Sequence, residues 1–265
     1  MRNKPKRTIR IIHNLARSGG TLIGKTLACM QNNALLSEIH PDAQHALSFN
    51  AIKQAQNWFD LDPNLHWQQI PFLEGIKKIQ QHCDKQEKKL ILRDWSHIDY
   101  FGFPVTNNPS QKDELTQLLT PHFEIKTVQI IRDPIDTWES FSRLNIVKES
   151  ELSISEFING YINYLIQTQS DFQLSYEEFL KHPNDQLKMT CEALDCKFDP
   201  SYKDNWFEFS NITGDQSSQS SLRKTSTIRP RPKKVINNEI KKKFMLDVKY
   251  QKLMKLLPQY DVIEC

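Results

Sequence analysis

The chain of 265 residues is long enough for one large α/β domain with a full core. Hydrophobic residues account for 38% of it and aromatic residues for 10%, which excludes an intrinsically disordered composition. Its formal net charge of +3 is compatible with anionic ligands but too small to indicate nucleic-acid binding by itself. We find no internal repeat and no clear linker, so we predict a single domain over residues 1–265.

The cysteines and apolar runs bear on cellular location. The five cysteines do not form, with each other or with histidines, the two pairs of ligands that a zinc site requires. We therefore expect reduced thiols and no bound metal. The first apolar run, residues 9–12, is too short for a signal peptide. No run approaches the roughly 18 apolar residues of a membrane span. These features favour a cytoplasmic protein without a membrane span.

Strand-like apolar runs alternate with helical patterns along the chain. Strands are expected at residues 9–12, 34–39, 89–93, 124–131 and 174–176. Helices are expected at 21–31, 72–83, 113–119, from Pro134 onward, and at 153–169, 183–194 and 238–257. Residues 41–69 look irregular, and the polar, then basic stretch 214–234 is expected to be a flexible loop. This order predicts an α/β fold with a central parallel sheet of about five strands between helices.

The stretch from Ile9 to Met30 has the form of a phosphate site. A short strand leads through a cationic, glycine-containing turn into a helix, whose first N–H groups and dipole favour anions. Residues 19–26, GGTLIGKT, match the nucleotide-triphosphate loop G-x-x-x-x-G-K-[ST], so an ATP-dependent kinase or NTPase is one alternative. Bulky Leu22 and Ile23, however, suit a helix that has already begun at Thr21, and this would place Lys25 on the helix.

A second motif follows the strand at residues 124–131. Arg132 is expected at the carboxyl end of that strand, where ligands bind in open α/β sheets, and Ser140 about two turns into the next helix. A guanidinium and a hydroxyl placed there can both bind a phosphate monoester. The alternative is a local ion pair between Arg132 and Asp133, with Ser140 on the helix surface.

Three motifs together resemble the family of sulfotransferases that use 3′-phosphoadenosine 5′-phosphosulfate (PAPS). They are RSGGT at residues 17–21, R-D-P-x-D-x-x-x-S at 132–140, and YEE at 176–178 with Pro183 following. The resemblance covers roughly residues 9–183. It implies a P-loop-like, nucleotide-kinase-related fold. It also implies in-line transfer of a sulfuryl group from PAPS to a hydroxyl or amine, releasing adenosine 3′,5′-bisphosphate without a metal.

The resemblance also implies roles for the donor-site residues. Arg17 stands where cytosolic members have a lysine at the bridging oxygen, and would stabilise the leaving phosphate. Residues of the loop and helix start would hold the 5′-phosphate: Ser18, Gly19, Gly20, Thr21 and Leu22. The 3′-phosphate would be bound by Arg132 and Ser140, with Tyr176 near the adenine. Leu22 replaces the usual tryptophan, so an aromatic wall for the adenine must come from elsewhere.

The family's C-terminal loop, which closes over the 3′-phosphate, corresponds to the basic stretch after Gly214. The usual Gly-x-x-Gly-x-x-Lys spelling is missing there. We expect Arg223 or Lys224 to supply the cation. The alternative is a solvated surface whose charges are screened by salt.

The general base is expected at the end of a strand. His97 follows the strand at residues 89–93 and is preceded by Ser96, similar to the Lys-Ser/Thr-His segment of cytosolic members, although Trp95 replaces the lysine. An ordinary histidine pKa suits proton removal at neutral pH. Other branches of the family use a glutamate, so Glu38, with His40 nearby, is the alternative base.

The acceptor is expected to be a small molecule or a carbohydrate, with no nucleic-acid partner. The variable stretches 41–69 and 100–111 are expected to line its pocket, and they contain Trp58, Trp67, Tyr100, Phe101 and Phe103, which could equally be core residues. A catalytically silent module that binds the donor without a base is a further alternative.

Overall fold

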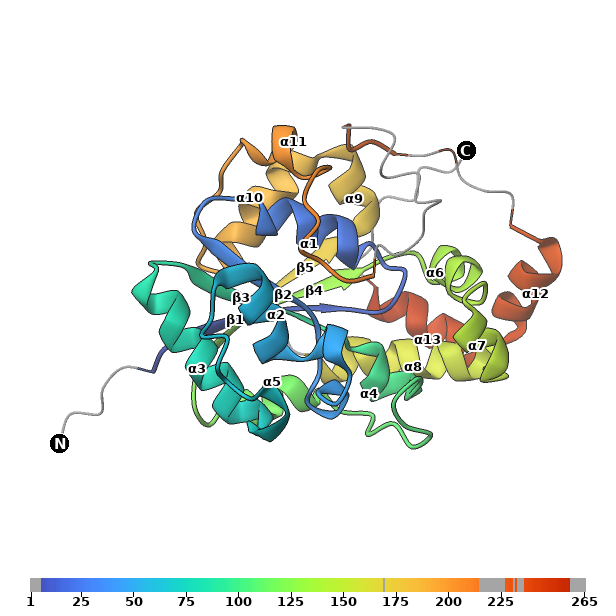
Figure 1. Cartoon of the computed structure of the whole chain (residues 1–265). Coiled ribbons are helices and arrows are strands. Elements are labelled where there is room, and N and C mark those ends of the chain that lie inside the picture. The colour runs from blue at the N-terminus through green and yellow to red at the C-terminus, as the bar shows by residue number, and fades with distance from the viewer. Residues whose placement is uncertain (1–5, 169, 215–226, 231, 233–235, 258–265) are drawn as a thin grey trace.

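A single sheet of five parallel strands forms the centre of the computed structural model (Figure 1), which describes residues 6–168, 170–214, 227–230, 232 and 236–257. The strands lie in the order β2-β3-β1-β4-β5. Their bounds are Thr8–Asn14 for β1, Asn33–Ile39 for β2, Lys89–Asp94 for β3, Glu124–Ile131 for β4 and Phe172–Ser175 for β5. The predicted five-stranded parallel α/β fold is therefore confirmed.

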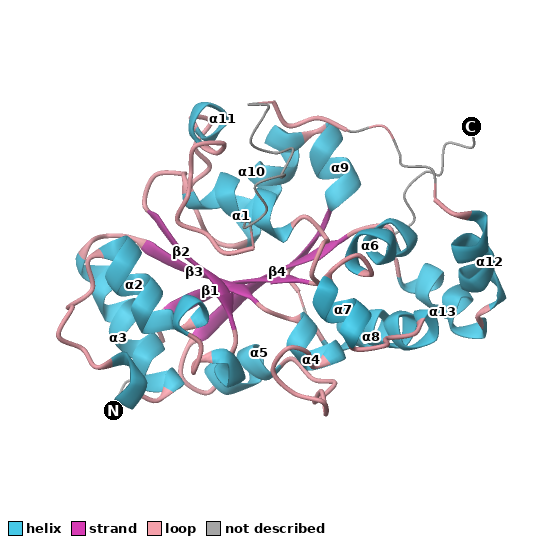
Figure 2. Cartoon of the chain, turned by 45° about the vertical axis from the view of Figure 1, so that its right-hand side comes forward, coloured by secondary structure: helices cyan, strands magenta, loops and turns pink. Residues whose placement is uncertain are grey.

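Helices cover both faces of this sheet (Figure 2). On one face lie α1 (Gly20–Ala28), α9 (Tyr176–Lys181), α10 (Pro183–Ala193) and α11 (Tyr202–Asn205). On the other lie α2 (Ala51–Phe59), α3 (Phe72–Lys85), α4 (His97–Phe101), α5 (Glu114–Leu119) and α8 (Ile154–Gln167). Beside α8 are α6 (Pro134–Phe141), α7 (Asn145–Glu149), α12 (Asn238–Leu246) and α13 (Val248–Leu256). Short 3₁₀ turns occupy Pro41–Ala43, Leu47–Phe49 and Trp67–Gln69.

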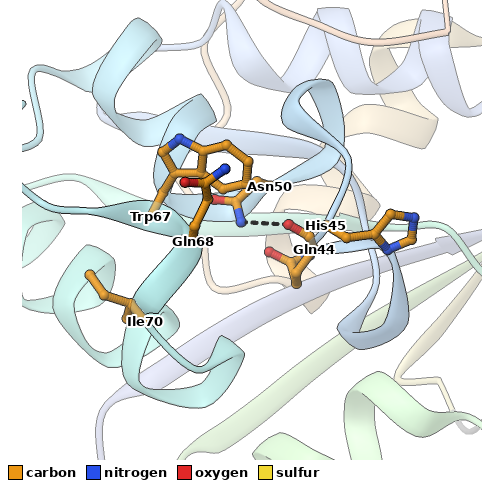
Figure 3. A pocket seen from close by; sticks show the side chains of 6 residues that line it. All are labelled: Gln44, His45, Asn50, Trp67, Gln68 and Ile70. Carbon is orange, nitrogen blue, oxygen red and sulfur yellow. Dashed lines mark hydrogen bonds between the residues drawn. The ribbon is translucent and has the colours of Figure 1, made fainter.

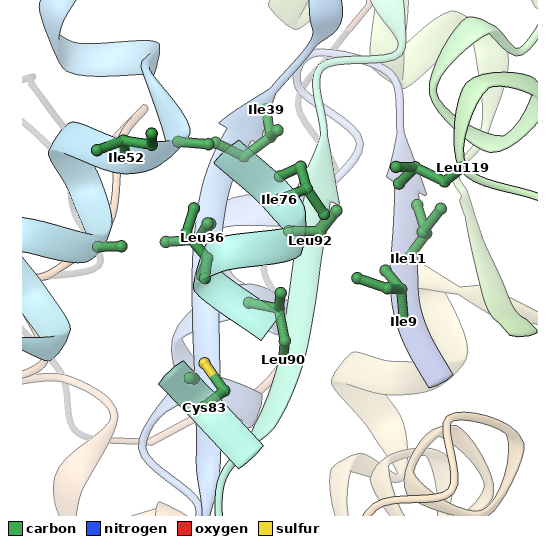
Figure 4. Packing of buried hydrophobic residues seen from close by; sticks show 14 of the residues in the cluster. Ile9, Ile11, Leu36, Ile39, Ile52, Ile76, Cys83, Leu90, Leu92 and Leu119 are labelled. Carbon is green, nitrogen blue, oxygen red and sulfur yellow. The ribbon is translucent and has the colours of Figure 1, made fainter. Parts of the chain in front are cut away.

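The strands are apolar on both sides because both sides are covered. Successive side chains alternate between faces: Leu90 and Leu92 of β3 point into the cluster with α2, α3 and α5, whereas Ile91 points into the cluster with α1 and α10. Figure 4 shows the first of these clusters, in which strand residues meet Ile52 of α2 and Ile76 of α3. This two-sided packing holds the carboxyl ends of the strands in register.

A third, largely aromatic cluster lies where α4, α6, α8, α12 and α13 meet. Phe157 of α8 is at its centre, with ring centroids of Phe101, Trp138 and Phe141 within 5.1–5.9 Å. The cluster therefore fixes α6, the helix that follows the second motif, against α8. None of the described helices has the length and apolar character needed to cross a bilayer.

Three predicted elements differ from those observed. Residues 238–257 form two helices and not one, because the Asp247 side chain accepts the Lys249 N–H and starts a new helix. The stretch 41–69 is less irregular than expected, since Asn50 caps α2 in the same way. Tyr176 begins α9 instead of ending a strand, with Ser175 as its N-cap.

Candidate functional site

The three motifs lie side by side at the carboxyl edge of the sheet. β1 leads into the loop at residues 15–19, β4 ends at Ile131 before Arg132, and β5 ends at Ser175 before Tyr176. Because β1, β4 and β5 are neighbours in the sheet, parallel pairing brings these chain segments to one edge. Ligands in open α/β sheets bind at this edge.

The backbone of the first loop adopts conformations that are costly for most residues. Arg17 has a φ of 70° and Gly19 a φ of 96°. The Ser18 hydroxyl is buried and donates to the Leu15 carbonyl at 2.7 Å, which closes the turn. A non-glycine residue in the left-handed region is a mark of a functional loop when the surrounding structure enforces it.

Gly19 lies directly against the ring of Tyr176. A Cβ atom at Gly19 would come within 2.1 Å of the ring, so this position has no room for a side chain. The close approach joins the first motif to the third.

The N-terminus of α1 offers unpaired backbone donors. The Ile23 N–H donates to the Gly19 carbonyl, so the N–H groups of Gly20, Thr21 and Leu22 have no acceptor within the helix. Leu22 itself is packed in the core beside α1, and only its backbone can face a ligand. Such a helix start, preceded by a strained loop, suits a phosphate or sulfate group.

Two guanidinium groups converge beside this loop. Arg17 Nε donates to Ser140 Oγ at 2.9 Å, and Arg132 Nη1 donates to the Arg17 carbonyl at 2.7 Å. Desolvation, and then the neighbouring charge of Arg132, lower the pKa of Arg17. Within the described residues, neither guanidinium forms a salt bridge with a carboxylate, and the buried Nε of Arg132 has no hydrogen-bond partner. Two adjacent, uncompensated cations constitute an anion site.

The backbone of Arg132 is held in place by two hydrogen bonds to one side chain. Its N–H donates to the Tyr161 hydroxyl at 3.1 Å, and that hydroxyl donates to the Arg132 carbonyl at 2.6 Å. The Arg132 guanidinium lies 4.9 Å from the centre of the Tyr176 ring, a cation–π contact. Tyr161 lies on the helix expected at residues 153–169 and was not identified as a site residue from the sequence.

The alternative of an Arg132–Asp133 ion pair is not observed. The Asp133 side chain accepts the N–H groups of Ile135 and Asp136 at 2.9 Å each and caps α6. The Asp133 N–H donates to Glu177 Oε1 at 3.0 Å, and burial raises the pKa of Glu177. The second and third motifs are thus joined through their acidic residues, which leaves the arginine side chain available for a ligand.

Glu38 lies close to the α1 N-terminus. The register between β2 and β3 shifts at this point, and Glu38 has a φ of 55°. Its carboxylate is 3.5 Å from the buried Arg93 guanidinium. A Cβ atom built on Gly214 would come within 2.8 Å of Glu38 Oε1 and 3.1 Å of Thr21 Oγ1, so carboxylate and hydroxyl lie together.

His97, the other candidate base, lies deeper. It packs among aromatic rings, with the Trp95 centroid 5.2 Å and the Phe103 centroid 6.2 Å away. Burial lowers the pKa of His97 to about 3, and the charge of nearby His40 adds to the effect. Its Nδ1 has no hydrogen-bond partner among the residues that the structure describes. At neutral pH the imidazole is therefore neutral and a weak proton acceptor.

His40 has both ring nitrogens engaged. Nε2 lies 3.1 Å from Asp99 Oδ1, and Nδ1 accepts the Asp42 N–H at 3.2 Å. Burial opposes protonation of this ring, but the bond to Asp99 and the charges of Asp94, Asp99 and Asp42 together outweigh it and raise the pKa of His40. The His40 ring thus has a structural role, because it accepts a backbone N–H in the turn that follows β2.

A buried group formed by His13, Asp94 and Asp113 has the composition of a metal site. His13 Nδ1 lies 2.9 Å from Asp94 Oδ2, and Nε2 lies 3.5 Å from Asp113 Oδ2. Burial would lower the pKa of His13, but Asp113 and Asp94 together raise it. An imidazolium between two carboxylates accounts for this arrangement without a metal ion. A second such group, His40, Asp42 and Glu114, is more exposed.

Residues after β2 line a cavity of about 360 Å³ (Figure 3). The lining residues are Gln44, His45, Asn50, Trp67, Gln68 and Ile70. All but Ile70 belong to the stretch 41–69, which is expected to line the acceptor pocket. The ring centroid of Phe49, next to Asn50, lies 4.2 Å from that of Trp95, and the Trp95 ring contacts His97, so a chain of aromatic contacts links the residue beside Asn50 to His97.

Two other expectations concern basic residues. Lys25 lies in the last turn of α1 and is buried, so it is a helix residue as the apolar spacing predicted. Arg223 and Lys224, the candidates for the C-terminal loop, lie outside the described residues.

Comparisons with known proteins bear on the fold. No protein-family model matches the chain, and no curated protein matches it. Among solved structures, it is similar to a sulfotransferase domain from the curacin biosynthetic pathway, with 17% identity and a TM-score of 0.59 over 95% of this chain and 98% of that one. A sulfotransferase domain from the Synechococcus PCC 7002 olefin synthase has 16% identity and a TM-score of 0.59, over 97% and 98% of the two chains. The chain thus has the fold of sulfotransferase domains.

Proposed function

We propose that this protein is a sulfotransferase that moves a sulfuryl group from PAPS to a hydroxyl or amine of a small-molecule or carbohydrate acceptor. The observation that carries the proposal is the convergence of Arg17, Arg132 and Ser140 beside the start of α1. The ribose of PAPS carries a phosphate at its 3′ position and a phosphosulfate at its 5′ position. This edge of the sheet offers one anion site at the start of α1 and one at the arginine pair.

In this proposal the 5′-phosphosulfate lies on the N–H groups at the start of α1, and the 3′-phosphate lies between Arg132 and Ser140. Arg17 keeps a full positive charge and stabilises the developing charge on the leaving phosphate. The glycines at positions 19 and 20 allow the side chains of Tyr176 and Asn14 to pack directly against the loop. Tyr176 contacts Arg132 and Gly19, which supports a position near the adenine.

For the proton, the contacts favour Glu38 over His97. Glu38 lies beside Thr21 at the proposed sulfuryl position, and its carboxylate is 3.5 Å from the Arg93 guanidinium. The acceptor oxygen would attack sulfur while its proton passes to the carboxylate, and the bond from sulfur to the bridging oxygen would break. His97 remains the alternative base, since no described residue is hydrogen-bonded to its Nδ1.

The kinase or NTPase alternative has less support. In a triphosphate loop the lysine of G-K-[ST] lies at the helix start, where it reaches the β- and γ-phosphates. Here Gly24, Lys25 and Thr26 are all inside α1, which begins at Gly20. The part of GGTLIGKT that would wrap a triphosphate is therefore helical.

The test of the proposal is transfer of labelled sulfate. The purified protein would be incubated with [³⁵S]PAPS and a panel of phenols, alcohols, amines and sugars. We expect a labelled product that requires Arg17, so that Arg17→Ala abolishes it. If the protein bound adenosine 3′,5′-bisphosphate but formed no labelled product from PAPS with any acceptor, the result would indicate the silent binding module instead.

A further inference from the structure

A surface at the end of the chain combines apolar and basic side chains. Five of the nine large apolar side chains that are exposed in the described part of the chain lie on α12 and α13. They are Met245, Leu246, Val248, Met254 and Leu256. We name these five residues, with the lysines between them, the α12–α13 surface. Leu246 is 71% exposed and Val248 87%, which is rare for side chains of this size at neighbouring positions.

The same two helices concentrate positive charge. They contain Lys241, Lys242, Lys243, Lys249, Lys252 and Lys255, all exposed, against two carboxylates, Glu239 and Asp247. The formal charge of this segment is +4, whereas the whole chain carries +3. None of the six lysines forms a salt bridge with another described residue. The positive charge of this segment is therefore exposed and not neutralised by salt bridges within the described residues.

The helices are fixed so that these side chains point outward. Phe244, Tyr250 and Leu253 are buried in the aromatic cluster against α8. On α12, Lys242 and Leu246 are four residues apart and share the face opposite Phe244. On α13, Val248, Lys252 and Lys255 share the outer face by the same spacing. Both views place α12 at the side of the molecule farthest from α3 (Figures 1 and 2).

We propose that the α12–α13 surface binds an anionic lipid membrane, with Leu246 and Val248 entering the interface and the lysines meeting acidic headgroups. Apolar side chains at the tip of a basic helical element are the composition of an interfacial membrane-binding segment. Lysine stems can lie along the apolar boundary while the ammonium groups stay with phosphates. The structure assigns this role independently of the sulfuryl donor.

Other occupants fit less well. A second copy of the chain would bring two segments of charge +4 face to face in an isologous contact. A nucleic acid would match the lysines but leave Leu246 and Val248 without an apolar partner, since phosphate contacts dominate such interfaces. An acidic bilayer matches both the positive charge of the lysines and the exposed apolar side chains of Leu246 and Val248.

The test is sedimentation of the full chain with sucrose-loaded vesicles. One set contains phosphatidylcholine alone and the other about 30% phosphatidylserine, because acidic lipids attract juxtamembrane lysines. We expect binding to the acidic vesicles only. Lys252→Gln with Lys255→Gln should reduce the partition coefficient by about tenfold or more, as each lysine contributes roughly fivefold. Leu246→Gln with Val248→Gln should also reduce it by about tenfold.

Matched controls make the result specific. Lys78→Gln with Lys85→Gln removes the same charge from the exposed side of α3, and Leu47→Gln alters an apolar side chain that is 55% exposed elsewhere. These variants should bind vesicles as the wild type does. Equal loss in the α3 variant, equal binding to both vesicle types, or vesicle binding unchanged in the α13 variant would overturn the proposal. So would a dimer in size-exclusion chromatography that Leu246→Gln dissociates.

Discussion

At the scale of single residues, the site is defined by two arginines that form no salt bridge with a carboxylate in the described part of the chain. Arg17 and Arg132 are close enough for the charge of one to lower the pKa of the other, and their nearest polar contacts are a hydroxyl and a carbonyl. Like charges held together in a folded protein cost free energy unless a ligand neutralises them. A dianionic phosphate between Arg132 and Ser140 would remove this repulsion.

Arg132→Ala should therefore weaken binding of adenosine 3′,5′-bisphosphate by about 1.5–3 kcal/mol, the size of a lost hydrogen bond to a charged group. Titration calorimetry would measure it. Arg143→Ala is the matched control, because Arg143 is exposed near the end of α6 and pairs with Glu139. Equal affinities for wild type and Arg132→Ala would remove this residue from the donor site.

The two candidate bases can be separated by isosteric substitution. Glu38→Gln should reduce sulfuryl transfer by roughly 10²- to 10⁴-fold, the usual size of a general-base effect, and leave binding of adenosine 3′,5′-bisphosphate unchanged. His97→Gln should reduce transfer much less, because the imidazole is a weak base in its buried position. Rates would be measured with saturating donor. The reverse order of effects would assign the proton to His97.

At the scale of elements, the contact between the loop and α9 depends on a missing side chain. Gly19 has both a left-handed backbone and a Tyr176 ring where its Cβ would be. Its position is set jointly by β1 and β5, which are far apart in the sequence but separated by one strand in the sheet.

Gly19→Ala should destabilise the protein by roughly 2 kcal/mol or more, from backbone strain plus overlap with the ring. Urea unfolding would give the change. The same substitution in a Tyr176→Ala background should cost less, because only the strain of the positive φ remains, and the double-mutant cycle measures the difference. Additive effects of the two substitutions would show that ring and loop are not in contact.

Local patterns predicted the elements with clear caps and apolar periods. The strands at 34–39, 89–93 and 124–131 were predicted at or near their observed bounds, since their runs are apolar and short. The break at Asp247 was missed because Asn238 to Leu257 has a continuous helical composition, and a capping aspartate within it resembles any exposed acidic residue. Helix α2 was missed for a similar reason, as its start depends on the side chain of Asn50.

At the scale of the whole molecule, the sheet order brings together site residues that are far apart in the sequence. The residues Arg17, Arg132 and Tyr176 could be singled out from motifs, and their convergence is observed. The partial exposure of Glu38 and the burial of His97 could not be predicted, because Glu38 lies at the end of β2, His97 follows β3, and their burial depends on which side chains pack above them. Tyr161, which fixes the Arg132 backbone, comes from a helix whose register only the packed structure specifies.

Burial of His97 should also affect the stability of the whole fold. Its pKa is lowered to about 3, so below its ordinary value only the unfolded chain takes up the proton. The stabilisation is therefore complete above pH 6.5 and is lost as the pH falls toward 3. Between pH 7 and pH 5, the free energy of unfolding should fall by about 2 kcal/mol more in the wild type than in His97→Gln.

The control for this pH effect is His66→Gln, which removes an exposed histidine. Its dependence on pH should parallel that of the wild type in urea titrations. His13 and His40, whose pKa values are raised, titrate in the opposite sense in all three proteins and cancel in the comparison. Parallel curves for wild type and His97→Gln would contradict the assignment of a buried, neutral imidazole.

The central claim is that the edge formed by β1, β4 and β5 binds the PAPS nucleotide. Titration calorimetry of the wild-type protein with adenosine 3′,5′-bisphosphate, and separately with ATP and magnesium, tests it most directly. We predict one-to-one binding of the bisphosphate and no heat from ATP with magnesium. Binding of ATP with magnesium and none of the bisphosphate would contradict the account.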